Sequence, residues 1–391
     1  MHDRHIHLDM PQELFYTGRL RISIHLTLEP SAIPVNKYLG PIENFEFSRQ
    51  DISRAVKEGR LLSMEMEFSL RCNFRCPYCY VPHENYYKDE LTLAEIRKTI
   101  LQAKALGAVK IIVLGGEPSI YPHTLELMRF IYSQGLQTEM FTNGTGITAE
   151  LAAQLHALGT RVVLKMNSFD QALQNRLSGH PGAFRIIQTA FQLLKEAGYP
   201  SRDHFLAVSS IICRQNIDEL PRMWQWLREQ GIAPYFEIIT PQANAKQNAW
   251  LEVDPLTLQD FFTRICEIDR KRFGQVWEAQ PPLVGNKCMR HQFSCLVTSK
   301  GDVTPCVGVT LPMGNIRKKP LKEILADSQI LKDLKDYRHT IKGPCRTCDK
   351  AQECYGCRGA AYQVTGDYLA SDPLCWCNAR QSEKRASGKT A

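Results

Sequence analysis

The sequence predicts an α/β protein in which a partial (β/α)6 TIM-like barrel precedes a small cysteine-rich, cluster-binding C-terminal domain. Two observations carry this prediction. Between Glu65 and about residue 270, short β-branched runs alternate with longer helical stretches. In addition, 11 of the 14 cysteines gather in two groups, one directly after the first expected strand and one in roughly the last quarter of the chain.

Six strands are expected from runs of strand-favouring residues, and six helices from apolar residues at helical spacing. The expected strands are 63–70, 109–114, 137–142, 161–166, 205–212 and 235–239. The expected helices are 93–106, 123–134, 149–158, 183–197, 217–230 and 255–273. Because β and α segments alternate in series, we expect parallel strands with crossover helices. In such barrels the chemistry collects at the C-terminal ends of the strands.

Composition and length are those of an ordinary globular chain with more than one part. The 391 residues suffice for a barrel plus an appendage, and 43% hydrophobic with 23% charged residues is a typical balance. We expect residues 1–60 to form an N-terminal extension, 61–275 the barrel, 285–380 the cysteine-rich domain and 381–391 a basic tail.

Charge and hydropathy patterns exclude some classes of function. No apolar run approaches the roughly 18–20 residues that a membrane span requires. The N-terminus, with His2, His5 and His7, lacks the apolar segment of a secretory signal and is expected to be a mobile polar tail. The net charge of +7 is spread over short basic stretches such as 317–319, so a nucleic-acid partner is not expected. The sequence therefore favours a cytoplasmic protein, in which clustered cysteines indicate metal rather than disulfides.

The first cysteine group reads Cys72-x3-Cys76-x2-Cys79. Three thiolates on one short loop can hold three irons of a four-iron cubane and leave the fourth iron open, just as a catalytic zinc keeps one position free for substrate. A zinc site with His83 as its fourth ligand is the alternative reading of this loop alone.

The second cysteine group is longer and regular. Its members are Cys288, Cys295, Cys306, Cys345, Cys348, Cys354, Cys357 and Cys375. Eight thiolates suffice for two fully ligated cubanes, and a pair of structural four-cysteine zinc knuckles is the alternative. Cys377 could take the place of Cys375 as the last ligand, whereas Cys213 and Cys266 stand alone in apolar segments and are expected to be buried thiols.

Polar residues follow the second, third and fourth expected strands. They lie in the segments 115–118, 142–145 and 167–170. Each segment alone could be a mere turn, because Gly and Asn are common turn residues. Together, at successive strand ends beside the three-cysteine loop, they indicate a binding site, in which paired glycines allow a ligand close to the backbone.

On these residues the chain resembles the radical S-adenosylmethionine (SAM) superfamily. Cys72, Cys76 and Cys79 match its cluster motif, with Tyr78 where the family keeps an aromatic residue. The resemblance spans about residues 62–270 and implies the binding of SAM on the open iron.

Three further motifs of that family are matched in the right order. Gly115-Gly116-Glu117-Pro118 is similar to the GGEP motif, which contacts the methionine amine of SAM. The stretch Thr142–Gly144, with Asn143 at its centre, is similar to a Thr-Asn-Gly strand end. Ser168 and Asp170 match a Ser-Leu-Asp stretch that approaches the ribose and carboxylate of SAM.

The C-terminal cysteines resemble the SPASM extension of the same superfamily. By that pattern, one auxiliary [4Fe-4S] cluster is held by Cys288, Cys295, Cys306 and Cys357. The second is held by Cys345, Cys348, Cys354 and Cys375. The resemblance therefore implies three [4Fe-4S] clusters, two of them fully ligated and suited to electron transfer.

The sequence departs from the family patterns at identifiable positions. Gln171 replaces a glycine after Asp170, and Ser178 falls near the position of a family arginine, with Arg176 close by. These departures leave the contact to the SAM carboxylate open. Val307 follows Cys306 where sulfatase-maturating relatives place an aspartate that acts as a base, so sulfatase maturation is disfavoured.

The resemblance implies an oxidoreductase that reductively cleaves SAM to a 5′-deoxyadenosyl radical, which removes a hydrogen atom from the substrate. The electron donor would be a flavodoxin or ferredoxin. A ribosomally made peptide or protein is the first substrate class expected. The stretches 356–362, 365–367 and 372–373 also resemble relatives that act on tetrapyrrole side chains, so a haem-pathway or other small-molecule decarboxylase or dehydrogenase is the second. A zinc-stabilised, non-enzymatic scaffold is the alternative from another class.

Overall fold

The computed structural model describes residues 47–82, 87–279, 283–284 and 286–379. All of them belong to one compact unit, Val35–Ala391. The N-terminal histidines, His83 and the basic tail of the sequence predictions lie outside the described residues.

The described strands form one 11-stranded sheet with the order β11-β10-β9-β1-β2-β3-β4-β5-β6-β7-β8. Its six central strands run parallel to one another. They are β1 (Ser63–Glu67), β2 (Lys110–Leu114), β3 (Gln137–Thr142), β4 (Arg161–Lys165), β5 (Leu206–Ile212) and β6 (Ala233–Ile238). In the described part of the sheet, β1 pairs with β9 and β6 with β7, so β1 and β6 do not pair with each other. The partial barrel is thereby confirmed.

Short strands extend the sheet on both sides. On one side they are β9 (Leu296–Val297), β10 (Asp302–Thr304) and β11 (Gly314–Asn315), and on the other β7 (Leu283–Val284) and β8 (Asn286–Lys287). β9 lies parallel to β1, with Glu65 opposite Leu296, and β10 and β11 continue antiparallel. Part of the cysteine-rich region is thus built onto the first strand of the barrel.

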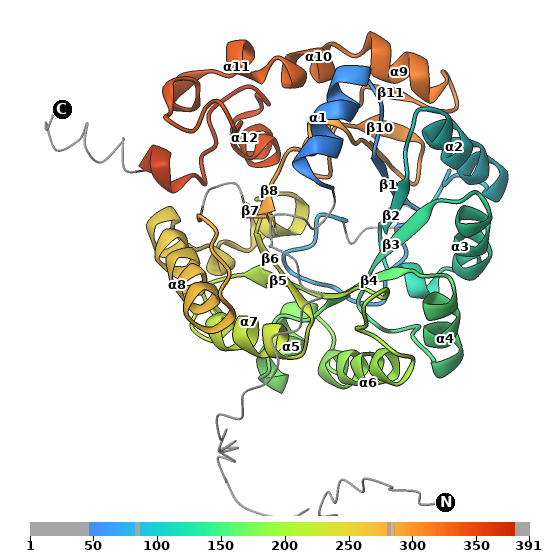
Figure 1. Ribbon diagram of the computed structural model, residues 1–391, viewed down its shortest axis with the longest axis vertical. Helices are drawn as coiled ribbons and strands as arrows, with labels where there is room; N and C mark the ends of the chain where they lie inside the picture. Colours follow the sequence, from blue (N-terminus) through green and yellow to red (C-terminus); the bar gives the residue numbers. More distant parts are fainter. Residues whose placement is uncertain (1–46, 83–86, 280–282, 285, 380–391) are drawn as a thin grey trace, which may run out of the picture. The chain divides into compact units, whose positions relative to one another are not determined.

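Helices surround the six parallel strands, as Figure 1 shows. They are α2 (Leu93–Ala105), α3 (Thr124–Ser133), α4 (Ala149–Ala157), α6 (Ala183–Glu196), α7 (Leu220–Glu229) and α8 (Pro255–Phe273). The main apolar core fills the space between these helices and the sheet. The C-terminal region adds α9 (Leu321–Asp327), α10 (Gln329–Lys335), α11 (Tyr337–Thr340) and α12 (Arg358–Thr365).

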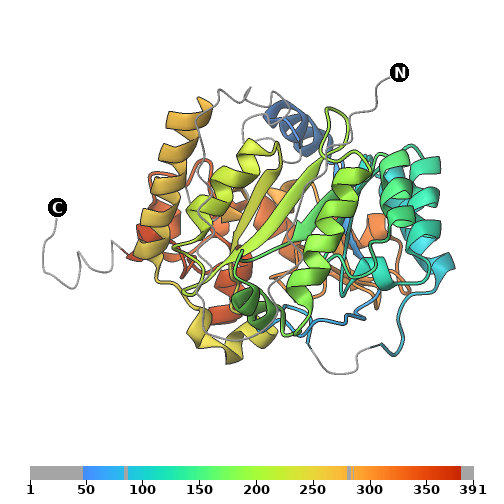
Figure 2. The same cartoon turned by 90° about the horizontal axis from the view of Figure 1, so that it is seen from below.

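Two further helices mark the two ends of the strands. The helices α1 (Arg49–Glu58) and α5 (Gln171–Ser178), which the sequence analysis did not predict, lie at opposite ends in Figure 2. Just before α1, the ring of Phe47 lies 5.1 Å from the Lys110 ammonium at the start of β2. α5 directly follows β4 and therefore lies at the C-terminal ends of the strands.

Two predicted boundaries moved by three residues, for local reasons. β1 ends at Glu67 and not at residue 70, because the following backbone turns to bond with the segment after β2. α7 begins at Leu220 and not at residue 217. The preceding residues form turns held by the Asn216 side chain, whose amide donates to the carbonyls of Asn167 (2.9 Å) and Ile211 (2.8 Å).

Charged side chains meet inside the barrel. A single carboxylate oxygen of Glu139 lies 3.3 Å from Lys110 Nζ and 2.8 Å from Arg161 Nε. Burial alone raises the pKa of Glu139, but the two cations outweigh burial and hold the pKa below its ordinary value. At β1, Glu65 forms an ion pair with Arg290 of the C-terminal region.

Candidate active site

The loop that carries Cys72, Cys76 and Cys79, here the cysteine loop (residues 72–79), follows β1 at the C-terminal end of the strands. Each thiol is half-buried, and the electrostatic interactions among them show that the three lie close together. Burial raises the pKa of all three thiols, that of Cys72 to about 12. Metal must therefore displace the thiol protons for the loop to present thiolates.

The cysteine loop begins against the glycines that follow β2. The N–H of Gly116 donates to the Ser69 carbonyl (2.8 Å), and the N–H of Glu117 donates to the Arg71 carbonyl (2.7 Å). A Cβ at Gly115 would lie 2.4 Å from the Ser69 oxygen, and one at Gly116 only 2.0 Å from the Arg71 oxygen. Both glycines are therefore required for two backbones to meet at the base of the loop.

The Glu117 carboxylate joins the ends of β2 and β3. It accepts hydrogen bonds from the Ser119 hydroxyl (2.5 Å) and N–H (2.9 Å), the Thr142 hydroxyl (2.5 Å) and the Asn143 N–H (2.5 Å). Burial nevertheless raises the pKa of Glu117. A buried carboxylate with four donors fixes the geometry of both strand ends.

The end of β3 also touches the cysteine loop directly. The side-chain amide nitrogen of Asn143 lies 3.7 Å from the Cys72 sulfur and donates to the Asn73 side chain (3.2 Å). Thr145 closes this group, since its hydroxyl lies 2.6 Å from the Asn143 side-chain oxygen and 2.9 Å from the Asn73 amide nitrogen. These strand-end residues therefore lie beside Cys72, the first cysteine of the loop.

Tyr78 is fixed by the end of β4. Its hydroxyl accepts from the Asn167 side-chain amide (2.8 Å), and the Lys165 ammonium lies 5.4 Å from its ring centroid. Lys165 in turn contacts Ser209 on β5 (2.9 Å) and Glu237 on β6 (3.3 Å). The side chains of Lys165 and Glu237 are 24% and 26% exposed, so this polar trio borders the open end of the barrel.

Ser168 and Asp170 make contacts within the protein at the start of α5. The Ser168 hydroxyl is buried and donates to the Glu219 carboxylate (2.6 Å), whose other oxygen accepts from the Phe169 N–H (2.8 Å). The Asp170 carboxylate caps α5 by accepting from the Leu173 N–H (2.7 Å). Glu219, which was not predicted from the sequence, thus helps to order this strand end.

The C-terminal end of α5 rests on the cysteine loop. The Ser178 carbonyl accepts from the Arg75 N–H (3.0 Å) and from the Cys76 thiol (3.6 Å). A Cβ at Gly179 would lie 2.1 Å from the Arg75 carbonyl oxygen. Arg176, close to the expected position of a family arginine, instead stacks on the Trp250 ring at 4.3 Å.

Cys288, Cys306 and Cys357 form one group in the C-terminal region. Burial and then the charge of Cys288 raise the pKa of Cys306 to about 11. The pKa of Cys357 is raised by burial, then by Asp372, and also by both other thiols. Cys295, the fourth ligand predicted for this group, lies in the main apolar core.

Cys345, Cys348 and Cys354 form the other group. Burial raises the pKa of Cys354 to about 11, and the charges of Cys345 and Cys348 add to the shift. The Cys345 sulfur accepts from the Asp372 N–H (3.4 Å) and from the Asn378 side chain (3.3 Å).

Two cysteines close in sequence, Cys375 and Cys377, are candidates for the fourth ligand of this group. Cys375 is buried and interacts with Asp372. Cys377 is half-buried. The pKa of Lys350 is raised by its hydrogen bond with Glu278 and further by the charges of Cys377 and Cys348. Both cysteines therefore lie within electrostatic reach of residues that border the second group.

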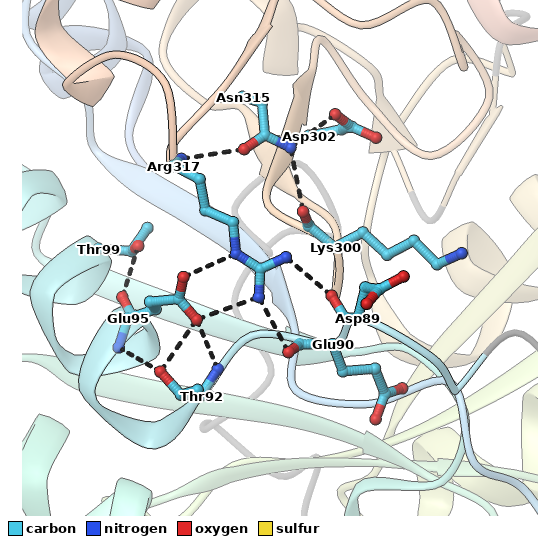
Figure 3. Close-up of polar contacts among 9 residues, drawn as sticks. All are labelled: Asp89, Glu90, Thr92, Glu95, Thr99, Lys300, Asp302, Asn315 and Arg317. Atoms are coloured by element: carbon cyan, nitrogen blue, oxygen red, sulfur yellow. Dashed lines mark hydrogen bonds and ion pairs between the residues drawn. The ribbon is translucent and has the colours of Figure 1, made fainter.

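Arg317 ties the C-terminal region to the segment between the cysteine loop and α2 (Figure 3). Its guanidinium binds the Glu95 carboxylate at 2.6 and 3.1 Å and donates to the carbonyls of Asp89 (2.9 Å) and Glu90 (3.0 Å). The Glu90 carboxylate accepts from the Ser69 hydroxyl (2.9 Å), next to the base of the cysteine loop. In the sequence, residue 317 is recognisable only as part of a short basic stretch.

Among the described residues, no three His, Cys, Asp or Glu side chains converge closely enough to hold a single metal ion. The ligands of a cubane stand farther apart, because each binds a different iron. No helix in the described part of the chain is long and apolar enough to cross a membrane.

Comparison with known families decides the identity of this arrangement. Residues 66–227 match the radical SAM superfamily, and residues 288–349 match the SPASM iron–sulfur cluster-binding domain. A PqqA peptide cyclase from Streptomyces rochei is 30% identical over 347 residues, which cover 83% of this chain and 92% of that protein. The chain belongs to the radical SAM superfamily. As a radical SAM enzyme of the SPASM group, it binds SAM and a [4Fe-4S] cluster, so the zinc-stabilised scaffold is set aside.

Other relatives of this radical SAM enzyme differ in their named substrates. An AdoMet-dependent heme synthase from Methanosarcina barkeri is 25% identical over 344 residues, covering 81% of this chain and 96% of that protein. Among solved structures, SuiB of Streptococcus suis bound to SAM superposes with a TM-score of 0.64 at 17% identity, over 84% of this chain and 81% of SuiB. The structural likeness supports the fold of the radical SAM enzyme, with its partial barrel and cysteine-rich C-terminal region.

Proposed function

We propose that this radical SAM enzyme oxidatively modifies a ribosomally made peptide or protein by hydrogen-atom abstraction. The 30% identity to a peptide cyclase over 92% of its length is the observation that carries the proposal. A cysteine loop at the open end of a partial barrel suits a long substrate, because the end of a peptide can enter while the rest stays outside.

In this proposal Cys72, Cys76 and Cys79 hold the catalytic cluster. When bound, the cluster and SAM supply the 5′-deoxyadenosyl radical. Three half-buried thiols close together on one loop, whose base is fixed by backbone contact at Gly116, fit such a group. The protein's own work is to hold the loop, orient SAM and exclude water from the reacting atoms.

The SAM-facing surface is proposed from the residues at successive strand ends. It comprises Tyr78, Gly115, Gly116, Glu117, Pro118, Asn143, Ser168 and Asp170. Asn143 supports this assignment because its amide already lies 3.7 Å from the Cys72 sulfur. Glu117, Ser168 and Asp170 contribute by fixing the strand ends, since their own polar atoms bind the protein.

Two auxiliary clusters in the C-terminal region complete the proposal, giving three [4Fe-4S] clusters per chain. The proposed domain boundaries are 61–275 for the barrel and 285–380 for the cluster-binding part. The auxiliary clusters would take the electron left on the substrate, and a flavodoxin or ferredoxin in the cytoplasm would reduce the catalytic one.

A haem-pathway tetrapyrrole is the second candidate substrate. Three AdoMet-dependent heme synthases, at 24–25% identity, each align over 81–83% of this chain. The stretch that suggested this class in the sequence surrounds Arg358 and Asp372, which are both buried in the structure. Because both side chains are buried in the protein, they do not distinguish a tetrapyrrole substrate from a peptide substrate.

Substrate trials separate the candidates directly. Anaerobically reconstituted enzyme, SAM and reductant are incubated with a peptide encoded beside the gene, or with an iron tetrapyrrole that carries propionate side chains. We expect a mass decrease of the peptide that corresponds to lost hydrogen, absent in a Cys72→Ala/Cys76→Ala/Cys79→Ala variant. Decarboxylation of the tetrapyrrole, with an unchanged peptide, would replace the first candidate by the second.

A further inference from the structure

Cys295 is placed where a core residue belongs. It directly precedes β9, in which Leu296 pairs with Glu65 and Val297 with Met66 of β1. Because side chains alternate along a strand, Cys295 and Val297 share one face, and both lie in the main apolar core. The Cys295 side chain is 1% exposed, and burial is the cause that raises its pKa to about 12. A thiol in these surroundings behaves as a small apolar side chain.

The three neighbouring cysteines behave differently. Cys288, Cys306 and Cys357 lie within electrostatic reach of one another. The Tyr355 hydroxyl donates to the Cys288 sulfur (3.7 Å), and the Ala360 N–H donates to the Cys357 sulfur (3.3 Å). Three thiolates leave one iron of a cubane without a protein ligand.

His291 is a buried side chain without any polar partner. It lies three residues after Cys288, in the short 3-10 helix η5 (Arg290–Gln292), and is only 2% exposed. Neither of its ring nitrogens has a hydrogen-bond partner among the described residues. Burying an imidazole in this way costs free energy that a native protein normally avoids by pairing the group.

The imidazole packs against a tyrosine that contacts the three-cysteine group. Its ring centroid is 5.1 Å from that of Tyr355, whose hydroxyl reaches the Cys288 sulfur. Burial, and then the charges of Arg358 and Arg290, lower the pKa of His291 to about 3. The ring is therefore neutral near pH 7 and keeps a lone pair for a metal.

We propose that His291, and not Cys295, is the fourth protein ligand of the auxiliary cluster held by Cys288, Cys306 and Cys357. This inference rests on the proposed presence of a cluster at that site. It accounts for both the unpaired imidazole and the apolar surroundings of Cys295. A neutral imidazole in place of a thiolate removes one negative charge from the ligand set, so the cluster is easier to reduce than one with four thiolates.

The test uses the full chain with Cys72, Cys76 and Cys79 replaced by alanine, so that the auxiliary clusters dominate the spectra. Protein labelled with ¹⁵N-histidine is compared with unlabelled protein by pulsed electron paramagnetic resonance of the reduced clusters. We expect a nitrogen hyperfine coupling that changes with the label and vanishes in His291→Cys. That variant keeps its iron and has a lower auxiliary reduction potential.

Cys295→Ala is the matched control in the same background. We expect it to keep the iron content, the nitrogen coupling and the potential. Loss of about four irons in Cys295→Ala, with an unchanged spectrum in His291→Ala, would overturn the inference. A full complement of about eight irons without any histidine coupling would also overturn it. About four irons in the background protein itself would show that an auxiliary cluster is missing, and iron analysis reports that failure separately from ligand identity.

Discussion

Arg317 and Glu95 form a bidentate ion pair across 222 residues of sequence, with nitrogen–oxygen distances of 2.6 and 3.1 Å. The pair joins the C-terminal region to the first turn of α2. Because the same guanidinium holds the carbonyls of Asp89 and Glu90, it also fixes the segment that leads away from the cysteine loop (Figure 3). The position of that loop therefore depends on the docking of the C-terminal region.

Replacement of Arg317 by methionine should weaken both stability and SAM binding. The change removes four hydrogen bonds of a charged group, so we expect a loss on the order of 1–3 kcal/mol in the free energy of unfolding. Anaerobic thermal unfolding and the dissociation constant for SAM measure the two effects. Arg97→Met is the control, because its exposed ion pair with Glu126 contributes little. Equal behaviour of the two variants would contradict the coupling.

Gly116→Ala should abolish the catalytic cluster and spare the others. An added Cβ would lie 2.0 Å from the Arg71 oxygen, so the base of the cysteine loop must move. We expect about four irons fewer per chain and no SAM cleavage. Gly135→Ala provides the comparison, since that glycine has a positive φ (+72°), which Gly116 lacks, but open space around it. If Gly116→Ala kept its full iron content, the proposed loop geometry would be wrong.

Glu117→Gln should loosen the ends of β2 and β3. A glutamine side chain has only one acceptor oxygen, so it cannot accept all four hydrogen bonds that the carboxylate accepts. Its NH2 group then faces a buried donor, which is left without an acceptor. We expect a loss of about 2 kcal/mol in stability and weaker SAM binding, measured by denaturant unfolding and calorimetry. Retention of wild-type SAM affinity would argue that Glu117 only supports the fold.

Glu67→Gln should change the pH dependence of stability. Burial raises the pKa of Glu67 to about 7, although the Ser299 N–H donates to it (3.1 Å). The folded protein thus keeps a proton that the unfolded chain releases near its ordinary pKa of 4.5. Wild-type stability therefore falls as pH rises from about 4.5 to about 7 and then levels off.

The glutamine variant lacks this loss. Its advantage over wild type should grow between about pH 4.5 and about pH 7 to on the order of 3 kcal/mol and stay constant above that. Anaerobic thermal unfolding at several pH values measures the difference, with the exposed Glu58→Gln as control. A difference that does not vary with pH would mean that Glu67 ionises normally in the folded protein.

Much of the barrel could be predicted because its signals are local. The strand over 137–142 and the helix over 255–273 were predicted with their observed bounds, since a β-branched run and an apolar period end there at clear turn residues. The cysteine loop and the glycines after β2 were likewise visible as short motifs. The fold class and the family followed from these local signals.

The remaining features depend on partners that are distant in sequence. Nothing near Arg317 in the sequence points to Glu95, and Lys165 meets Glu237 only because β4 and β6 both border β5. The spacing of cysteines likewise predicts Cys295 in a ligand set but does not show that it lies in the main apolar core, next to the pairing of β9 with β1. Strand pairing decides which face a residue occupies, and spacing alone does not encode it.

The central claim is that three clusters are present and that the cysteine loop holds the catalytic one. Iron, sulfide and 5′-deoxyadenosine are therefore measured per chain in reconstituted wild type and in the Cys72→Ala/Cys76→Ala/Cys79→Ala variant. We expect about twelve irons in the wild type and about eight in the variant, together with complete loss of 5′-deoxyadenosine. Unchanged 5′-deoxyadenosine in the variant would contradict the account, because SAM would then be cleaved away from the cysteine loop.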